Sequence, residues 1–319
     1  MNYYNNNLEL PFSKKKIYFR ELNTKEQLLI TKANISFSRT NEDCKEYHYY
    51  ILDIVLNCIK NKEDFLKINI IEYILFLLKL RILSVGSEIE FLMVNTKNKT
   101  KLTIDLKKYM FNLYNIANKI NNDEYTIFKN DLKIKVNWPF LNSISNFDIK
   151  DTKDFNQYQS FENTLFSYIE SITISDKKID LLNFNEEEKI NIFNKIPAVF
   201  KNEIEKKVLN LINDITNENL FGLDVLDDYK FNIYNMNFVE HIKIIFSYDL
   251  KSLYKEIYYL AVNNLPPEFV FQISDFERKT FLTIIQEENQ KSEQSDNNSS
   301  EYSDAIKKLA VEFNQDLNK

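Results

Sequence analysis

The sequence predicts an α+β fold that is predominantly helical, with N-terminal hairpins packed on helices and a helical C-terminal half. Two observations predict this fold class. Apolar residues recur at the spacing of helices along most of the chain, and short β-rich runs beside polar turns occur mainly within residues 8–136. The chain has 319 residues, 44% of them hydrophobic and 28% charged, which is enough to bury a substantial core.

The N-terminal region carries three candidate strand pairs. Two extended stretches within residues 8–20 flank a polar turn that contains three consecutive lysines. Residues 88–94 and 102–106 flank a second polar turn, and residues 125–128 and 132–136 flank a third. Apolar residues alternate along the last of these strands, as in a strand with one buried face. We therefore expect hairpins in this region.

Helices are expected between these hairpins. Thr24 opens a capping-box pattern that predicts a helix to about residue 35, and an apolar stripe predicts another over residues 43–60. The strongest helix begins with a second capping box, Asn69 to Glu72, and stops at Gly86. Because this helix is apolar on nearly every side, we expect it at the centre of the N-terminal core.

The second half of the chain is mainly helical in pattern. We expect helices over about residues 156–172, 186–196, 198–213, from 237, 250–261 and 274–288, and a strand over 229–233. This pattern divides the chain into an N-terminal α+β region (1–148), a mainly helical region (149–286), a flexible polar linker (287–303) and a short amphipathic helix (304–319).

Composition excludes several classes of function. Average usage would place about 22 glycines in a chain of this length, but only two are present. Phosphate-binding loops, dinucleotide fingerprints and nucleophile elbows all require glycine, so these motifs are excluded. Cys44 and His48 lie too far in the sequence from a matching second pair of ligands to suggest an ordinary structural zinc site. We expect no cofactor and no metal.

Charge and hydropathy indicate which kinds of partner the chain binds and where in the cell it is made. A net charge of −6 gives no general attraction to nucleic acid or to anionic membranes. The longest apolar run, residues 70–85, is shorter than a membrane span and contains charged residues. The first seven residues lack the pattern of a secretory signal, so we expect synthesis in the cytoplasm.

Few residues are candidates for chemistry. Cys44 and His48, one helical turn apart, could form a thiol–imidazole pair, but no oxyanion donor or orienting group accompanies them, so we favour a half-exposed helix surface. His241 is interpreted as hydrogen-bonded or exposed. Arg81 lies inside the most apolar helix, where it is either a buried or snorkelling arginine tied to one acid or an interface residue. We expect no enzymatic activity.

The end of the chain offers a second candidate interface. Ile306, Leu309 and Phe313 share one helical face after the polar linker. A helix this short is marginal by itself, so it must fold against another surface. We therefore predict that these three side chains form an interface.

Several segments of the N-terminal region together look familiar. They are Leu-Pro-Phe at 10–12, Lys-Ile-Tyr-Phe-Arg-Glu-Leu at 16–22, Thr-Lys-Glu at 24–26, Ile-Leu-Asp at 51–53, Asn-Cys-Ile at 57–59 and Leu-Phe-Leu-Leu-Lys-Leu-Arg-Ile at 75–82. In this order they resemble the baseplate hub protein family of T-even-type contractile-tailed phages, chiefly over residues 8–140. Residues 274–291 look like the ends of some members.

The resemblance implies a structural or assembly component of the baseplate hub with no enzymatic role. The implied partners are other hub or tail proteins, including the tape-measure protein. The implied locations are the host cytoplasm during assembly and, if the protein is retained, the virion tail baseplate. A variant of this hypothesis is an assembly chaperone that is absent from the mature virion. An enzyme using Cys44 and His48, and a nucleic-acid-binding protein, remain as alternatives.

Overall fold

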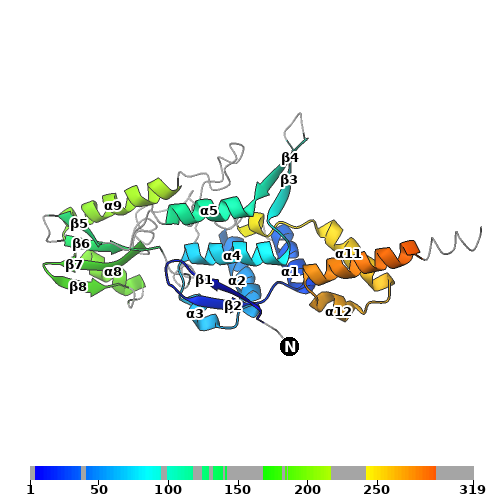
Figure 1. Cartoon of the computed structure of the whole chain (residues 1–319). Helices are drawn as coiled ribbons and strands as arrows, with labels where there is room; N and C mark the ends of the chain where they lie inside the picture. Colours follow the sequence, from blue (N-terminus) through cyan, green and yellow to red (C-terminus); the bar gives the residue numbers. More distant parts are fainter. Residues whose placement is uncertain are drawn as a thin grey trace, which may run out of the picture. The chain divides into compact units, whose positions relative to one another are not determined.

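The helix α4 (Ile70–Ser84) is labelled in Figure 1. Almost every one of its side chains is buried, as its all-round apolar sequence predicts. Only Lys79, Ile82 and Leu83 are partly exposed. Such a helix must be covered by other elements, because leaving its apolar surface in water would cost about 25 cal/mol for each Å². The core around it contains residues from the N-terminal hairpin, the neighbouring helices and the strands that follow.

The structure is a computed structural model that describes residues 4–36, 41–94, 99–117, 124–128, 132–138, 141, 168–181, 184, 186–216 and 242–291. The chain divides into two units. The first unit consists of residues 1–22 and 26–248, and the second unit consists of residues 23–25 and 249–319. The boundaries predicted after residues 148 and 303 lie outside the described residues.

Elements before residue 249 alternate between helices and antiparallel strands. The helices are α1 (Thr24–Ser36), α2 (Asn41–Asn57), α3 (Lys62–Leu66), α4, α5 (Leu106–Ala117), α8 (Glu186–Asn194) and α9 (Ala198–Thr216). The strands are β1 (Asn6–Glu9), β2 (Lys16–Phe19), β3 (Glu88–Val94), β4 (Lys99–Asp105), β5 (Glu124–Phe128), β6 (Leu132–Val136), β7 (Ile169–Ile174) and β8 (Lys177–Asp180). The predicted fold class, α+β and predominantly helical, is confirmed.

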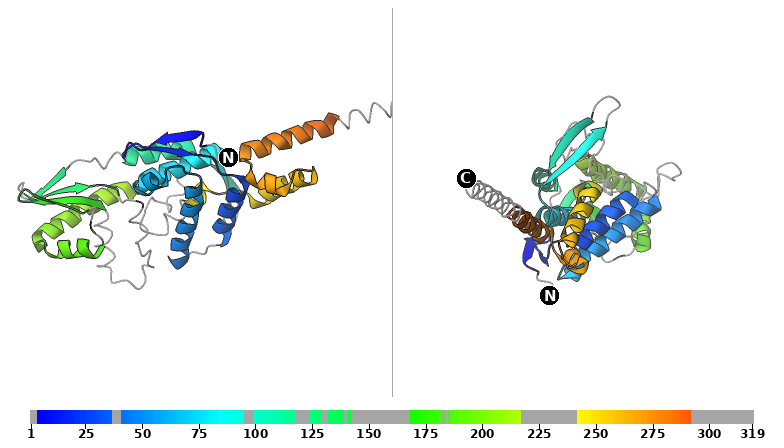
Figure 2. Two further views of the ribbon diagram at one scale, coloured as in Figure 1. Left: turned by 90° about the horizontal axis from the view of Figure 1, so that it is seen from below. Right: turned by 90° about the vertical axis from the view of Figure 1, so that its right-hand side faces the viewer.

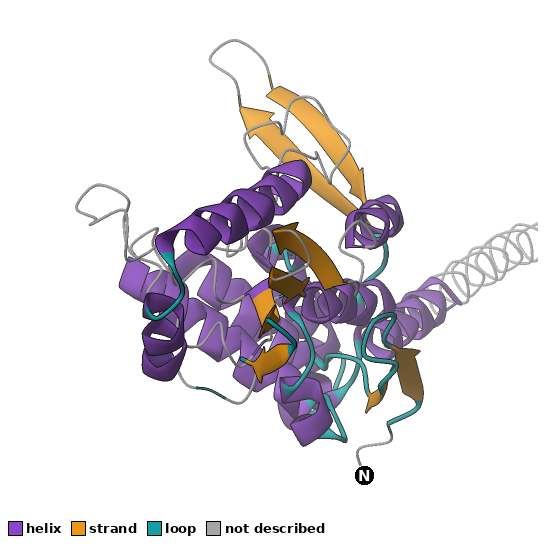
Figure 3. Ribbon diagram, turned by 90° about the vertical axis from the view of Figure 1, so that its left-hand side faces the viewer, coloured by secondary structure: helices purple, strands orange, loops and turns teal. Residues whose placement is uncertain are grey.

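The described strands form three separate antiparallel sheets (Figure 3). β1 pairs with β2, β3 pairs with β4, and the third sheet has the order β5-β6-β7-β8. The three predicted hairpins are therefore present. β6 alternates between buried and partly buried residues, as its sequence predicts, and α9 packs against β5 and β6.

One predicted helix is partly wrong. Residues 169–172, which we expected to end a helix over 156–172, belong instead to β7, which lies between β6 and β8. Ser175 and Asp176 both have positive φ, 47° and 67°, which is the geometry of a tight two-residue hairpin turn. Pairing with β6 on one side and β8 on the other favours the strand, an effect of tertiary context that a local pattern does not include. Residues 156–167 lie outside the described part.

The backbone on the second edge of β2, opposite β1, also forms hydrogen bonds. The amide of Arg20 donates to the carbonyl of Cys58 at 3.0 Å, and the amide of Lys60 donates to the carbonyl of Tyr18 at 2.9 Å. The Phe19 ring then meets the Phe76 ring edge-on with 5.0 Å between centroids. The hairpin is thereby packed on α4 by its backbone and its apolar side chains together.

The chain returns to this core near the end of the first unit. A helix over residues 242–245 leads to Phe246, which is fully buried. The Asn34 side-chain amide donates to the Phe246 carbonyl at 2.7 Å, and the Tyr47 hydroxyl donates to Asn34 Oδ1 at 2.6 Å. The strand and helix start predicted at 229–237 lie outside the described residues.

The second unit is a small helical cluster containing α11 (Leu250–Val262), α12 (Pro267–Gln272) and a helix over residues 275–291 (Figure 2). The last helix begins where the sequence predicts, and it begins with a capping box: Ser274 N donates to Glu277 Oε2 at 2.8 Å, and Glu277 N donates to Ser274 Oγ at 3.2 Å. This helix extends to residue 291, so residues 287–291, expected to begin the polar linker, are helical.

A buried arginine ties this unit together. Arg278 donates to Glu256 Oε2 at 2.7 Å, to Thr24 Oγ1 at 2.8 Å and to the carboxylate of Asp275. The Thr24 hydroxyl in turn donates to the Ile273 carbonyl at 2.9 Å. A guanidinium that is 3% exposed needs such partners, because an unpaired buried charge would be strongly destabilising.

The capping box of α4 does more than begin the helix. Asn69 Oδ1 accepts from the Glu72 amide at 2.9 Å, and the Glu72 carboxylate accepts from the Asn69 amide at 3.4 Å, as predicted. Glu72 Oε1 also accepts from the amides of Phe12 and Ser13 at 2.9 and 2.6 Å. The fully buried Glu72 carboxylate therefore joins the hairpin turn to the start of α4.

We predict that Glu72→Gln lowers the free energy of unfolding by about 2 kcal/mol, because the neutral amide loses the charge-assisted bonds to three backbone amides. Urea denaturation measures this change. The matched control is Glu203→Gln on the exposed side of α9, which is expected to stay within about 0.5 kcal/mol of the wild type. Equal stability of the two variants would contradict the role assigned to Glu72.

Candidate protein-binding groove

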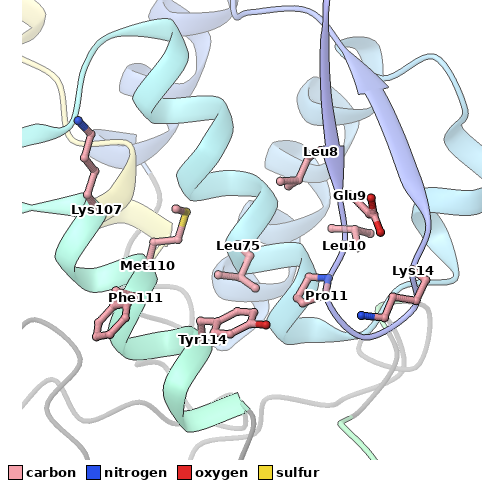
Figure 4. Close-up of a pocket in the computed structure, with 10 residues that line it drawn as sticks. All are labelled: Leu8, Glu9, Leu10, Pro11, Lys14, Leu75, Lys107, Met110, Phe111 and Tyr114. Atoms are coloured by element: carbon pink, nitrogen blue, oxygen red, sulfur yellow. The ribbon is translucent and has the colours of Figure 1, made fainter.

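A groove lies in the first unit between the β1–β2 hairpin and α5 (Figure 4). Its volume is about 430 Å³. It is lined mainly by apolar side chains and by the stems of two lysines, namely Leu8, Glu9, Leu10, Pro11, Lys14, Leu75, Lys107, Met110, Phe111 and Tyr114. Leu10 of the hairpin and Leu75 of α4 are buried, and an apolar surface of this kind suits another protein.

The helix α5 has two apolar faces, and only one of them is buried in the core. Leu106, Tyr109 and Leu113 are buried on the side of the core, where α5 packs against α4. Phe111 and Tyr114 lie on the side of the groove and are 64% and 43% exposed. Exposed aromatic residues that cluster around a groove are typical of contact surfaces rather than of core packing.

The opposite wall is built by the hairpin turn. The Leu10 amide donates to the Lys15 carbonyl at 2.9 Å, and the Lys14 amide donates to the Leu10 carbonyl at 3.1 Å. The Phe12 ring stacks on the Tyr114 ring, with centroids 6.4 Å apart and an interplanar angle of 26°. This contact links the turn to α5, while the Glu72 carboxylate fixes the turn to α4. The hairpin turn and α5, which form the two walls of the groove, are therefore held in place relative to each other.

Exposed charges border this apolar surface. Lys14 comes from the hairpin turn and Lys107 from the first turn of α5, on the two sides of the groove (Figure 4). Glu9 lies on the hairpin side. With two cations and one anion, this border favours a partner segment that carries an acidic residue beside its apolar side chains.

His48 is not the half-exposed residue that we expected. It is 4% exposed, and its ring meets the Tyr73 ring edge-on at 5.7 Å. Burial lowers its pKa from 6.5 to about 4. The prediction was wrong because we assigned the buried side of this helix from the spacing of its apolar residues, whereas the burial of His48 depends on its packing against α4. Nothing is described of the Cys44 side chain, and His241 lies outside the described residues.

The other cysteine is a core residue. Cys58 follows the last residue of α2 and is fully buried, as expected from the apolar stripe over residues 43–60, and burial raises the pKa of its thiol. Nearby, Arg20 donates to both carboxylate oxygens of Glu26, at 2.8 and 2.6 Å. The Cys58 sulfur lies 3.6 Å from Glu26 Oε2 and 3.6 Å from the Ile54 carbonyl oxygen, so the protonated thiol is a hydrogen-bonded group of the core.

Arg81 is buried, as one of its two predicted roles requires, whereas the predicted tie to one acid stays a prediction. Arg81 is 4% exposed, and one of its guanidinium nitrogens donates to the Gly86 carbonyl at 2.8 Å. The guanidinium carbon lies 4.9 Å from the centre of the Tyr248 ring, a cation–π distance. The interface role of Arg81 stays a prediction. Ile306, Leu309 and Phe313 lie outside the described residues.

The sequence interpretation missed the groove. Its signal was present in α5, where Met110, Phe111 and Tyr114 stand beside the core positions and make the apolar surface wider than one buried face requires. Their exposure could not be read from spacing alone, because it depends on where the hairpin turn lies.

Two further searches concern the described part of the chain. None of its helices combines the length and the hydropathy that a membrane span requires. Within the same residues, no three His, Cys, Asp or Glu side chains are grouped as they would be around a metal ion.

Comparison with known proteins identifies the family. The family model described as T4 bacteriophage base plate protein matches residues 1–220, which is more than half of the chain. The chain belongs to this family. Searches of curated proteins and of solved structures found no match.

The match confirms the predicted resemblance at the level of the baseplate family. It extends beyond residues 8–140, on which the resemblance chiefly rested, but it does not reach residues 274–291, so the resemblance of that segment stays a prediction. This baseplate protein has a structural or assembly role in the phage tail, together with other tail proteins. All residues of the groove fall within the matched range, whereas α11, α12 and the helix 275–291 follow it.

The buried His48 generates a pH-dependent prediction. In the unfolded baseplate protein His48 takes up a proton near pH 6.5, but in the folded protein only near pH 4. Protons therefore favour unfolding, and the contribution of neutral His48 is complete above about pH 7 and is lost as the pH falls from 6.5 toward 4. At pH 5 this loss is about 2 kcal/mol.

Urea denaturation between pH 7.5 and pH 5 measures this effect. A His48→Phe variant keeps an aromatic ring against Tyr73 but does not titrate, so its stability should fall by about 2 kcal/mol less than that of the wild type over this range. Parallel pH profiles of the two proteins would show that His48 does not contribute as described.

Proposed function

We propose that this chain is a structural or assembly component of the baseplate hub of a contractile-tailed phage and acts by protein–protein contacts. The observation that carries the proposal is the exposed apolar face of α5 in the groove, within the range that the baseplate family model matches. Folding alone gives no reason for Phe111 to be 64% exposed beside other apolar side chains.

The partner that fits this surface is a segment of another hub or tail protein with apolar side chains and at least one acidic residue. Its apolar side chains would lie over Leu75 and against Phe111, and its carboxylate would lie near Lys14 or Lys107. The tape-measure protein is one candidate for this partner. Because the groove walls are fixed by the Glu72 bonds and the Phe12–Tyr114 contact, little ordering entropy opposes binding.

We propose further that the chain has no enzymatic activity. This is supported by the burial of His48, whose imidazole is 4% exposed and packs against Tyr73, and by the burial of the Cys58 thiol. Neither group is placed to reach a substrate from solvent in the structure.

The groove is tested by substitution of Phe111. We expect Phe111→Asp to weaken binding to the hub partner at least tenfold, because it places a charge against an apolar surface, while its exposure leaves folding intact. Co-expression with the other hub and tape-measure proteins identifies the complex, and calorimetry on the purified proteins gives the dissociation constants.

Phe276→Asp is the matched control, since Phe276 is also an exposed aromatic residue, 74% exposed, but lies in the second unit. It should bind the partner as the wild type does. Wild-type affinity of Phe111→Asp would contradict the proposed use of the groove, and a chain that binds no hub or tail protein would contradict the proposed function.

Mass spectrometry of purified virions separates two forms of this proposal. A structural hub component is expected in intact particles. The alternative, a chaperone for the tape-measure protein or the hub, predicts that the chain binds its partner during assembly and is absent from particles. We expect the chain to be present, in a fixed ratio to other hub proteins, and its absence would favour the chaperone.

A further inference from the structure

The second unit presents an apolar stripe that its own described core does not use. Tyr254, Tyr258 and Val262 stand four residues apart on α11 and are 43%, 70% and 54% exposed. Leu253 and Leu260, on another face of the same helix, are buried. We refer to Tyr254, Tyr258 and Val262 as the α11 stripe. Its spacing matches the contact surface that a second helix would need.

The core of this unit is small. It contains Leu260, Val270, Ile273 and Ile285, with only a few partly buried hydrophobic residues around it. A unit of this size gains little stability from burial, so any further apolar contact matters. Arg278 bonds to Glu256 of α11 and to Asp275, and these bonds hold α11 against the helix 275–291. The helix that carries the stripe is therefore held in place within the unit.

The sequence beyond residue 291 supplies a matching surface. Ile306, Leu309, Ala310 and Phe313 recur at the spacing of one helical face. A short helix of this kind is stable only when it packs against something else.

Chain geometry permits these two surfaces to meet. Asn289 Nδ2 donates to the Tyr259 hydroxyl at 3.1 Å, so the helix 275–291 ends beside α11. Residues 292–303 could span up to about 40 Å if extended, whereas the stripe from Tyr254 to Val262 is only about 12 Å long. A polar tether of this length gives an effective concentration in the millimolar range.

Charge supports the same pairing. Lys251 and Lys255 are exposed and border the α11 stripe on one side. On a helix over residues 304–319, Glu312 and Asp316 would border the apolar face on one side as well. An orientation that brings the two borders together places opposite charges next to each other.

We propose that residues 304–313 dock as a helix on the α11 stripe of the same chain. Ile306, Leu309 and Phe313 pack against Tyr254, Tyr258 and Val262, and the acidic border faces Lys251 and Lys255. This contact assigns the interface predicted for the end of the chain to the chain itself. It is independent of the groove and of the hub assignment.

Hydrogen–deuterium exchange of the full-length chain tests the docking. In the wild type, amides of residues 306–313 should exchange at least tenfold more slowly than in an unstructured peptide of the same sequence. Tyr258→Asp and the double variant Leu309→Asp/Phe313→Asp should each abolish this protection, since each removes one side of the contact. Tyr258 is 70% exposed, so its substitution leaves the unit folded.

Phe111→Asp is the matched control, because it alters an exposed aromatic residue of the first unit and should leave the protection unchanged. Protection should also be the same over a hundredfold range of protein concentration. Three results would overturn the proposal: unprotected amides in the wild type, protection that survives Tyr258→Asp, or protection that grows with concentration, which would assign the occupant to a second copy.

Discussion

The hydrogen bonds of one buried carboxylate hold the N-terminal hairpin turn against the start of α4, and the groove of the first unit depends on this placement. Glu72 is fully buried and accepts hydrogen bonds from the amides of Phe12, Ser13 and Asn69. A carboxylate in this position is tolerable only because several donors surround it. The same group therefore begins α4 and determines where the hairpin turn lies. One wall of the groove is a consequence of this interaction.

The second wall follows from the composition of α5. This helix buries one apolar face against α4 and leaves another beside the hairpin turn, with Phe111 and Tyr114 exposed. A helix that served folding alone would carry polar residues there. The baseplate family match covers both walls, so the groove belongs to the part of the chain that the family shares. The α11 stripe lies beyond that part and represents a separate surface.

Local signals in the sequence were sufficient for much of the fold. The capping box at Asn69 forms as predicted, the helix expected from Ser274 begins there, and Gly86 follows α4 with a φ of 121° that favours glycine. The alternation along β6 likewise predicted its buried face. In each case the determining interaction lies within a few residues of the signal, so spacing alone contains the information.

The errors concern interactions between distant residues. β7 is a strand because it pairs with β6 and β8, and His48 is buried because Tyr73 of α4 packs against it. The groove was missed for the same reason, since the exposure of Phe111 depends on a hairpin turn held by Glu72, about 60 residues farther along the chain. Neither pairing partners nor packing neighbours can be derived from helical spacing.

The central claim is that this baseplate protein acts through the groove between the β1–β2 hairpin and α5. Lysine-reactivity footprinting of the chain, alone and within purified baseplate assembly intermediates, tests it directly, because Lys14 and Lys107 border the groove and are exposed in the free chain. The account predicts that both lysines become protected in the assembly, whereas Lys255 of α11 keeps its reactivity. Unchanged reactivity of Lys14 and Lys107 in an intermediate that contains the chain would contradict it.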